Sequence, residues 1–144
     1  MSRPAFVVLG SLILVATTIS CGEDTPTSPT PTPPANVIET FSGTLGKNAA
    51  TSYTFTASAT GSVTATLTAV GPDAKGTDDL PLVVGFGIGT WSNPQCTVLL
   101  AQDRAIQGSV ILGNVNASGT LCVRIFDVGN VVDQVDYTIN VSHP

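Results

Sequence analysis

Acidic residues and a single histidine are the side chains in this sequence that could carry out acid–base chemistry. A hydrolytic triad needs a base, usually histidine, beside a nucleophile. His143 stands next to the end of the sequence, where we expect a solvated, frayed tail. Paired carboxylates could act on a glycosidic bond instead, but most of the aspartates lie in or beside turns, where Asp is favoured for local hydrogen bonding alone. The sequence therefore predicts that the chain is not an enzyme. The aspartates concerned are Asp73, Asp78, Asp79, Asp103, Asp127, Asp133 and Asp136.

The densest acidic group, Asp73, Asp78 and Asp79, is the candidate metal site. Calcium takes about six to eight oxygen ligands, which acidic loops can supply. These aspartates lack the regular spacing of an EF-hand loop, so solvated turn carboxylates are the favoured interpretation and a calcium ion is the alternative. Zinc is disfavoured because structural zinc sites combine several His and Cys ligands. No cofactor is predicted.

The only tryptophan, Trp91, is the candidate ligand-binding residue, together with Asn93 and Gln95. It follows a run of alternating glycines, in a stretch that we expect to form a loop. An amphipathic ring beside amide side chains can stack on a sugar. The alternative, which we favour, is that the ring plugs one end of the hydrophobic core.

The charge balance bears on the possible partners. The formal net charge is −5, with 42% hydrophobic and only 10% charged residues. Such a composition predicts a folded chain, and its length suits one ordinary domain. The few basic residues are scattered singly, so no patch exists that could bind the phosphates of nucleic acid.

The first 21 residues have the layout of a secretory signal. Arg3 precedes an apolar run from residue 5 to residue 16, which is too short to span a bilayer. The following Thr17-Thr18-Ile19-Ser20-Cys21 resembles the lipobox of bacterial lipoproteins, in which the cysteine is acylated and becomes the new N-terminus. Thr18 departs from that pattern, which usually has Leu there. The resemblance implies cleavage before Cys21 and a lipid anchor on it; the alternative is an ordinary signal that leaves Cys21 as a free thiol.

Residues 21–36 are rich in proline and threonine, which favours an extended polyproline II stalk between the lipid and the folded part. Bacterial lipoproteins kept in the inner membrane often have Asp after the acylated cysteine, whereas this chain has Gly22. The resemblance therefore implies a cell-envelope protein, in the outer membrane if the organism has two membranes. Three acyl chains would anchor it stably.

Cys96 and Cys122 remain once Cys21 is assigned to lipid. In an exported protein, two such thiols usually form a disulfide. The bridge would close a loop of roughly 27 residues and contribute about 3 kcal/mol by an entropic estimate. The alternative is two buried, reduced thiols.

From residue 37 onward the hydrophobic pattern has the two-residue period of half-buried strands and no helical period. One example has a face made of Val63, Ala65, Leu67 and Ala69 and an opposite face of threonines. Another strand has Gly85, Gly87 and Gly89 along one face, which predicts close packing against it or a bend in the sheet.

We predict a hairpin about Gly129-Asn130 between the last two strands, a turn at Gly113-Asn114 and a weaker strand over residues 106–112. The pattern predicts an all-β fold, a single antiparallel β-sandwich of about eight strands over residues 37–144. The clearest further alternations are Tyr53, Phe55 and Ala57; Leu82, Val84, Phe86 and Ile88; Leu121, Val123 and Ile125; and Val135, Tyr137, Ile139 and Val141.

The order of these segments resembles the bacterial pre-peptidase C-terminal (PPC-like) domain over residues 37–142. This resemblance implies a jelly-roll-like sandwich of the kind appended to secreted proteases and other exported enzymes. The chain departs from the family where members often have an alternating Asp-x-Asp-Leu stretch, because it has Asp78-Asp79-Leu80 there. No peptidase accompanies the domain. The segments that carry the resemblance are Phe41-Ser42-Gly43-Thr44-Leu45, Ser52-Tyr53-Thr54-Phe55, Gly61-Ser62-Val63-Thr64-Ala65-Thr66-Leu67, Gly119-Thr120-Leu121-Cys122-Val123-Arg124-Ile125 and Tyr137-Thr138-Ile139-Asn140-Val141.

These observations predict three segments: a lipoprotein signal peptide over 1–20, an acylated cysteine and stalk over 21–36, and a β-sandwich over 37–144. The predicted function is a non-catalytic binding module, attached to the membrane through its lipid anchor, that holds a glycan, an envelope polymer or a protein. The alternative is a mainly structural domain that assembles with another exported protein.

Overall fold

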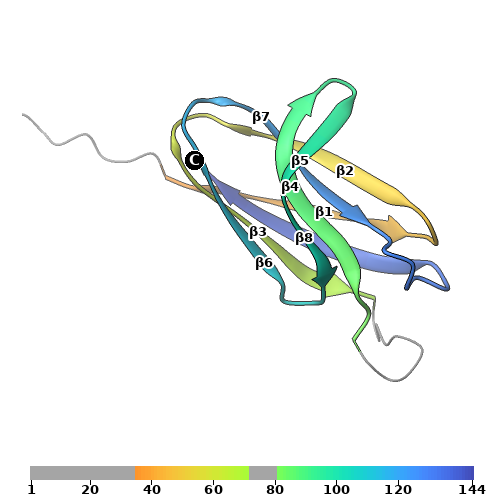
Figure 1. The fold of residues 1–144 in the computed structure, drawn as a ribbon. Helices are drawn as coiled ribbons and strands as arrows, with labels where there is room; N and C mark the ends of the chain where they lie inside the picture. The colour runs from red at the N-terminus through yellow and green to blue at the C-terminus, as the bar shows by residue number, and fades with distance from the viewer. Residues whose placement is uncertain (1–34, 72–80) are drawn as a thin grey trace, which may run out of the picture. The chain divides into compact units, whose positions relative to one another are not determined.

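The computed structural model describes residues 35–71 and 81–144, and within them the chain is all-β (Figure 1). These residues contain no helix, and so none that is long and apolar enough to cross a membrane. Cys21, Asp73, Asp78 and Asp79 lie outside the described residues. The strands are β1 (Val37–Leu45), β2 (Ala50–Ala57), β3 (Gly61–Val70), β4 (Val84–Ser92), β5 (Gln95–Ala105), β6 (Val110–Val115), β7 (Gly119–Phe126) and β8 (Val135–His143).

The eight strands form two four-stranded antiparallel sheets, in the orders β1-β8-β3-β6 and β2-β7-β4-β5 (Figure 1). This arrangement confirms the predicted β-sandwich. The edge strands β1 and β2 contact each other on one side of the sandwich, and the edge strands β5 and β6 contact each other on the opposite side.

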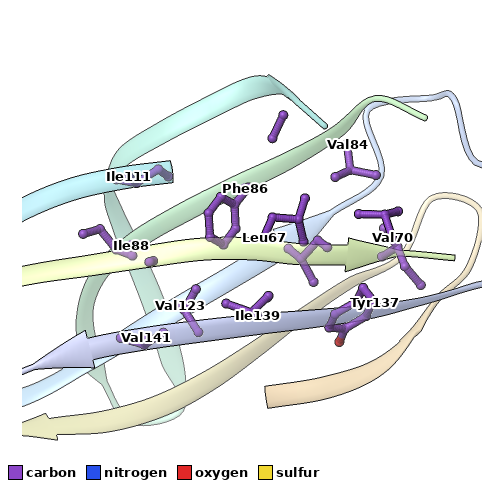
Figure 2. Packing of buried hydrophobic residues seen from close by; sticks show 14 of the residues in the cluster. Leu67, Val70, Val84, Phe86, Ile88, Ile111, Val123, Tyr137, Ile139 and Val141 are labelled. Atoms are coloured by element: carbon purple, nitrogen blue, oxygen red, sulfur yellow. The ribbon is translucent and has the colours of Figure 1, made fainter. Parts of the chain in front are cut away.

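The core forms between the sheets from side chains that alternate along each strand. On β3, Val63, Ala65 and Leu67 are buried, while the threonines between them face outward. The same period buries alternate residues of β2 and β8, as predicted, whereas β4 is buried on both faces from Val84 to Gly89 because its glycine face is covered as well. Figure 2 shows Phe86 of β4 and Ile139 of β8 in one cluster between the sheets. The two-residue period therefore identifies most of the core directly from the sequence.

A β-bulge in β3 alters the predicted alternation near the end of the strand. The pairing with β8 shifts between Leu67 and Ala69, because a bulge inserts an extra residue opposite one partner. The prediction that Ala69 continues the buried face is therefore wrong. Ala69 is half-buried, and Val70 is fully buried in its place.

The turn from β5 to β6 lies earlier than predicted. It spans Ile106 to Ser109, whose backbone N–H donates to the Ile106 carbonyl at 2.9 Å, and Gly108 there has a φ of 89°. The predicted turn at Gly113-Asn114 is wrong, because both residues belong to β6 and pair with β3. The predicted strand over residues 106–112 accordingly begins at Val110 and extends to Val115.

The connection from β7 to β8 contradicts the predicted hairpin about Gly129-Asn130. β7 pairs with β2 and β4, whereas β8 pairs with β1 and β3 in the other sheet, so the loop crosses between the sheets. The Asp127 carboxylate holds this loop. Its Oδ1 accepts the backbone N–H groups of Gly129, Asn130 and Val131 at 2.8, 2.9 and 3.0 Å. Its Oδ2 accepts the N–H of Asn48 at 2.8 Å.

These four donors also govern the ionisation of Asp127. Burial alone would raise the pKa of this carboxyl, but the backbone N–H groups bond its charged form and hold the pKa below its ordinary value. Because the folded-state pKa is lowered, the ionised carboxylate stabilises the fold above the pKa of an unfolded aspartate. This contribution is lost as the pH falls through the folded-state value.

We therefore expect Asp127→Ala to lower the free energy of unfolding at neutral pH by on the order of 1 kcal/mol, since four backbone N–H groups lose their acceptor. As the pH is lowered below about 4, the free energy of unfolding should also fall less for the variant than for the wild type, because the variant has no Asp127 carboxylate to protonate. Urea unfolding at neutral and acidic pH measures both effects. Asp133→Ala, an exposed aspartate of the same loop, is the matched control. Identical acid profiles for Asp127→Ala and the wild type would contradict the prediction.

Candidate functional site

The glycine row of β4 allows other parts of the sheet to pack closely on its outer face, as the sequence predicts. The Phe126 ring lies directly over Gly85, and a Cβ placed on Gly87 would lie 2.6 Å from Cγ1 of Val98. At Gly89, the Thr97 carbonyl of β5 occupies the space that a side chain would need. The pairing of β4 with β5 shifts its register twice along this stretch. β5 therefore follows a strongly irregular course beside β4, which only glycine positions permit.

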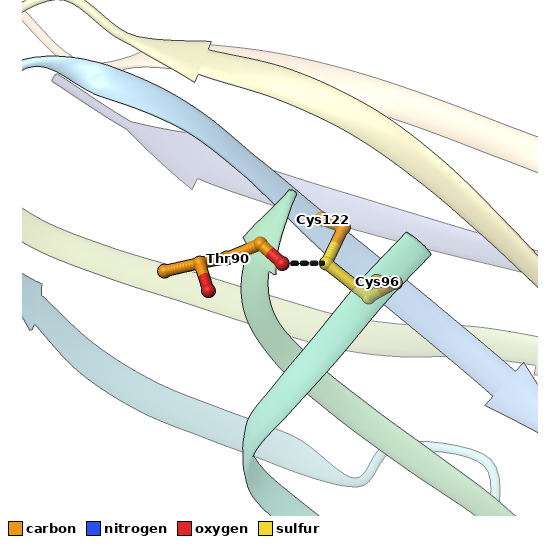
Figure 3. Close-up of a disulfide and its surroundings, with 3 residues drawn as sticks. All are labelled: Thr90, Cys96 and Cys122. Carbon is orange, nitrogen blue, oxygen red and sulfur yellow. Dashed lines mark hydrogen bonds between the residues drawn. A yellow bond between two sulfur atoms is a disulfide. The ribbon is translucent and has the colours of Figure 1, made fainter. Parts of the chain in front are cut away.

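A disulfide between Cys96 and Cys122 fixes this course and confirms the predicted bridge (Figure 3). Cys96 is on β5 and Cys122 is on β7, the two neighbours of β4, and their Cα atoms are 5.8 Å apart. The Sγ of Cys122 lies 3.3 Å from the Thr90 carbonyl oxygen; since a disulfide sulfur carries no proton, this is a contact and not a hydrogen bond. The bridge thus connects two strands across the one between them.

The predicted loop position of Trp91 is wrong, because Trp91 lies within β4 and pairs with Cys96 of β5. Its side chain is half-buried and is not part of the core cluster of the described residues, so the core-plug interpretation is not supported. Asn93 and Gln95 are exposed in the hairpin between β4 and β5. The structure brings the three residues together in one hairpin, but the tryptophan offers a sugar only part of its ring.

His143 is buried, which corrects the prediction of a solvated tail. Its side chain is only 4% exposed, and its Nε2 lies 2.9 Å from Oε1 of Glu39 on β1. The ring also packs on Phe55, with the ring centroids 5.1 Å apart. Ser58 donates its backbone N–H to the Pro144 carbonyl at 2.8 Å, and this hydrogen bond fixes the residue that follows His143. His143 continues the buried alternation of Tyr137, Ile139 and Val141, so the two-residue period could have revealed its position.

This histidine has neighbours that suit anchoring more than catalysis. Within the described ranges, the hydrogen-bond partners of its ring nitrogens are the Glu39 carboxylate and the Pro144 carbonyl. Neither is a hydroxyl or thiol from which the ring could take a proton to generate a nucleophile. In the same ranges, no group of three or more His, Cys, Asp or Glu side chains could hold a metal ion.

Aromatic side chains close the β1–β2 side of the sandwich. Phe41 stacks on Tyr53 with centroids 5.0 Å apart, and the Tyr53 hydroxyl donates to the Ser42 carbonyl at 3.0 Å. The hydroxyls of Tyr53 and Tyr137 lie 2.9 Å apart. Burial, with the Tyr53 hydroxyl contributing, raises the pKa of Tyr137 to about 12, so its phenol remains neutral. Stacked rings and hydrogen-bonded hydroxyls thus fill this side of the sandwich.

The β5–β6 side is open and contains a cleft of about 260 Å³ between the sheets. Gln102 of β5 connects the two edge strands by donating from Nε2 to the Val110 carbonyl of β6 at 2.9 Å. Gly113 contributes to the opening because it places no side chain in the wall; a Cβ there would lie 3.0 Å from Cδ1 of Ile88 and 3.3 Å from Cδ1 of Leu100. The lining is almost wholly apolar and consists of Phe55, Val63, Ile88, Gly89, Leu99, Leu100, Gly113, Asn114, Val115 and Leu121.

Exposed aliphatic side chains lie on the two edge strands that border this opening and on the turn between them. Leu99 is 66% exposed and Leu112 is 71% exposed, and both lie on edge strands. Large exposed apolar patches on a folded domain mark interaction sites. This surface was not predicted from the sequence, although the consecutive leucines at 99 and 100 already break the alternation of β5. The remaining large exposed aliphatics of this side are Leu100, Ile106 and Val110.

No protein-family model matches the chain, and no curated protein matches it. The similarity of residues 37–142 to the pre-peptidase C-terminal domain therefore stays a prediction from the sequence. The function has to be inferred from the chemistry of the site, and the most distinctive chemistry in the described residues is the apolar β5–β6 edge.

Proposed function

We propose that the chain is a non-catalytic binding module of the bacterial cell envelope that holds a protein at its β5–β6 edge. The lipid anchor predicted at Cys21 and the predicted stalk over residues 21–36 would attach the sandwich to the outer face of a membrane. The observation that carries the proposal is the apolar cleft with its exposed leucines.

The size and lining of the cleft favour protein side chains over a glycan. A cleft of about 260 Å³ is small for an entire small-molecule ligand but suits one or two aliphatic side chains. Sugar rings require hydrogen-bonding groups and an exposed aromatic face, whereas this lining is apolar and Trp91 is half-buried on the outer face of β4. The strands on either side of the cleft also have edges on which an extended segment could pair.

Photocrosslinking in cells tests this function with the full chain. A benzophenone amino acid replaces Leu99 at the mouth of the cleft or, as the matched control, Val132, which is 67% exposed on the β7–β8 loop. In cells that naturally produce the chain, position 99 should give a discrete protein adduct and position 132 should not. Gly113→Ala, which narrows the cleft, should reduce the yield from position 99 severalfold, while Trp91→Ala should leave it unchanged.

Two outcomes would contradict the proposed function. One is the absence of any protein adduct from position 99 above the level at position 132. The other is loss of the adduct in Trp91→Ala but not in Gly113→Ala, which would place protein binding at the β4–β5 hairpin instead of the cleft.

A further inference from the structure

β6 is an edge strand without the features that usually prevent edge pairing. Among the described strands its one sheet neighbour is β3, so no strand pairs with its other edge there, where Gln102 donates to the Val110 carbonyl. Natural edge strands are protected by charges, prolines or bulges. β6 (Val110–Val115) has none of them: its sequence is Val-Ile-Leu-Gly-Asn-Val, and its pairing with β3 has no register shift.

The exposed side chains of β6 reinforce this property. Leu112 is 71% exposed and Val110 is 42% exposed on the outer face of the sheet. A strand that pairs with β6 would cover these side chains on one face and the mouth of the cleft on the other. The edge therefore offers both backbone hydrogen bonds and apolar surface to the same partner.

The charges at this edge distinguish between possible partners. The chain as a whole has a formal charge of −5, so two copies repel each other over most of their surfaces. On β5 and β6 together the charged residues are Asp103 and Arg104, both exposed on β5. The edge is thus neutral and has one group of each sign, so two copies of this negatively charged chain can approach along it without opposing like charges.

We infer that the partner at the β5–β6 edge is a second copy of this chain, joined about a two-fold axis by antiparallel pairing of β6 with β6. This inference rests on the proposed function and names the protein that the edge binds. Antiparallel pairing of a strand with its own copy satisfies two-fold symmetry, because each contact of one residue with a second residue of the other copy occurs twice, once in each direction. The two β1-β8-β3-β6 sheets then form one continuous sheet, and the leucines of β5 meet across the two clefts.

The size of the edge is adequate for a stable contact. β5 has 11 residues, which corresponds to a length of about 35 Å at roughly 3.3 Å per residue. The depth of the edge surface equals the spacing of two stacked sheets, about 10 Å, plus the side chains that project from the outer face of each sheet. Such a surface approaches the roughly 800 Å² per partner that a standard interface buries.

Sedimentation velocity of the purified full chain in a mild, density-matched detergent tests this inference. The wild type should sediment as a dimer. Leu112→Asp should raise the dissociation constant of the dimer on the order of 100-fold, because the two-fold axis places two altered side chains in one interface. Val132→Asp introduces the same charge at a position with similar exposure on the β7–β8 loop, and it should leave the dimer intact. Circular dichroism of each variant verifies that the fold is retained.

Each other result overturns the inference. A wild type that remains monomeric at high concentration excludes the second copy as the partner. A dimer that Leu112→Asp does not weaken places any self-association elsewhere on the chain. In either case, a discrete adduct of a different protein from position 99 in cells would still support the proposed function, whereas absence of that adduct would remove both.

Discussion

Replacing Gly89 with alanine is expected to lower the free energy of unfolding by about 3 kcal/mol or more, at the upper end of the cost of overpacking. The methyl group would occupy the position of the Thr97 carbonyl and come within 2.7 Å of the Val98 Cα, and both belong to the backbone of β5. A flexible side chain can rotate away from a new methyl group, but a paired strand cannot move without loss of its hydrogen bonds. The change is therefore a large part of the roughly 5–15 kcal/mol that stabilises a typical domain.

Gly119→Ala is the matched control for this substitution. Gly119 also lies in a strand of the same sheet, and a Cβ added there meets no atom within 4 Å. Urea unfolding of both variants, followed by circular dichroism, should show a large loss for Gly89→Ala and a change of less than about 0.5 kcal/mol for Gly119→Ala. Equal stabilities of the two variants would mean that β5 does not pass as close to β4 as the structure shows.

The alternation of side chains predicted the buried face of β2, β3 and β8, because local backbone geometry decides which residues share a face and the apolar face is the one that packs in the core. Val63, Ala65 and Leu67 are buried for this reason, and so are the alternate residues of β8. The same rule extends to His143, which was predicted to be solvated only because it stands near the end of the sequence. A period that continues to the last residues is thus better evidence of burial than position in the chain.

The choice of sheet for each strand could not be predicted in this way. The turn residues Gly129-Asn130 suit a hairpin, yet β7 and β8 belong to different sheets. A hairpin turn and a loop that crosses between sheets use the same residue types. Which of the two forms depends on pairing with strands that are distant in the sequence. The apolar β5–β6 edge escaped prediction for a related reason: Leu99 is exposed because β5 is an edge strand with an irregular register, and neither property is encoded locally.

Removal of the disulfide is the second change with a large expected effect. Cys96 and Cys122 are 26 positions apart, and the bond keeps the unfolded chain from exploring the conformations of that loop. The variant with both cysteines changed to alanine should therefore lose about 3 kcal/mol in the free energy of unfolding. Denaturant unfolding of the oxidised wild type and the double variant gives this difference directly.

The structure separates the contribution of the bond from that of the packing around it. Cys122 is fully buried, so its change to alanine also removes a buried sulfur, whereas chemical reduction of the wild type leaves both sulfurs in place. In the reduced protein, the Cys122 thiol gains a proton that it can donate to the Thr90 carbonyl, 3.3 Å from its Sγ in the oxidised form. We thus expect reduction to cost less than the double substitution, and the difference to measure the packing of Cys122. If the reduced wild type were as stable as the oxidised one, the course of β5 would depend on the glycines of β4 alone, and the bridge would add nothing to it.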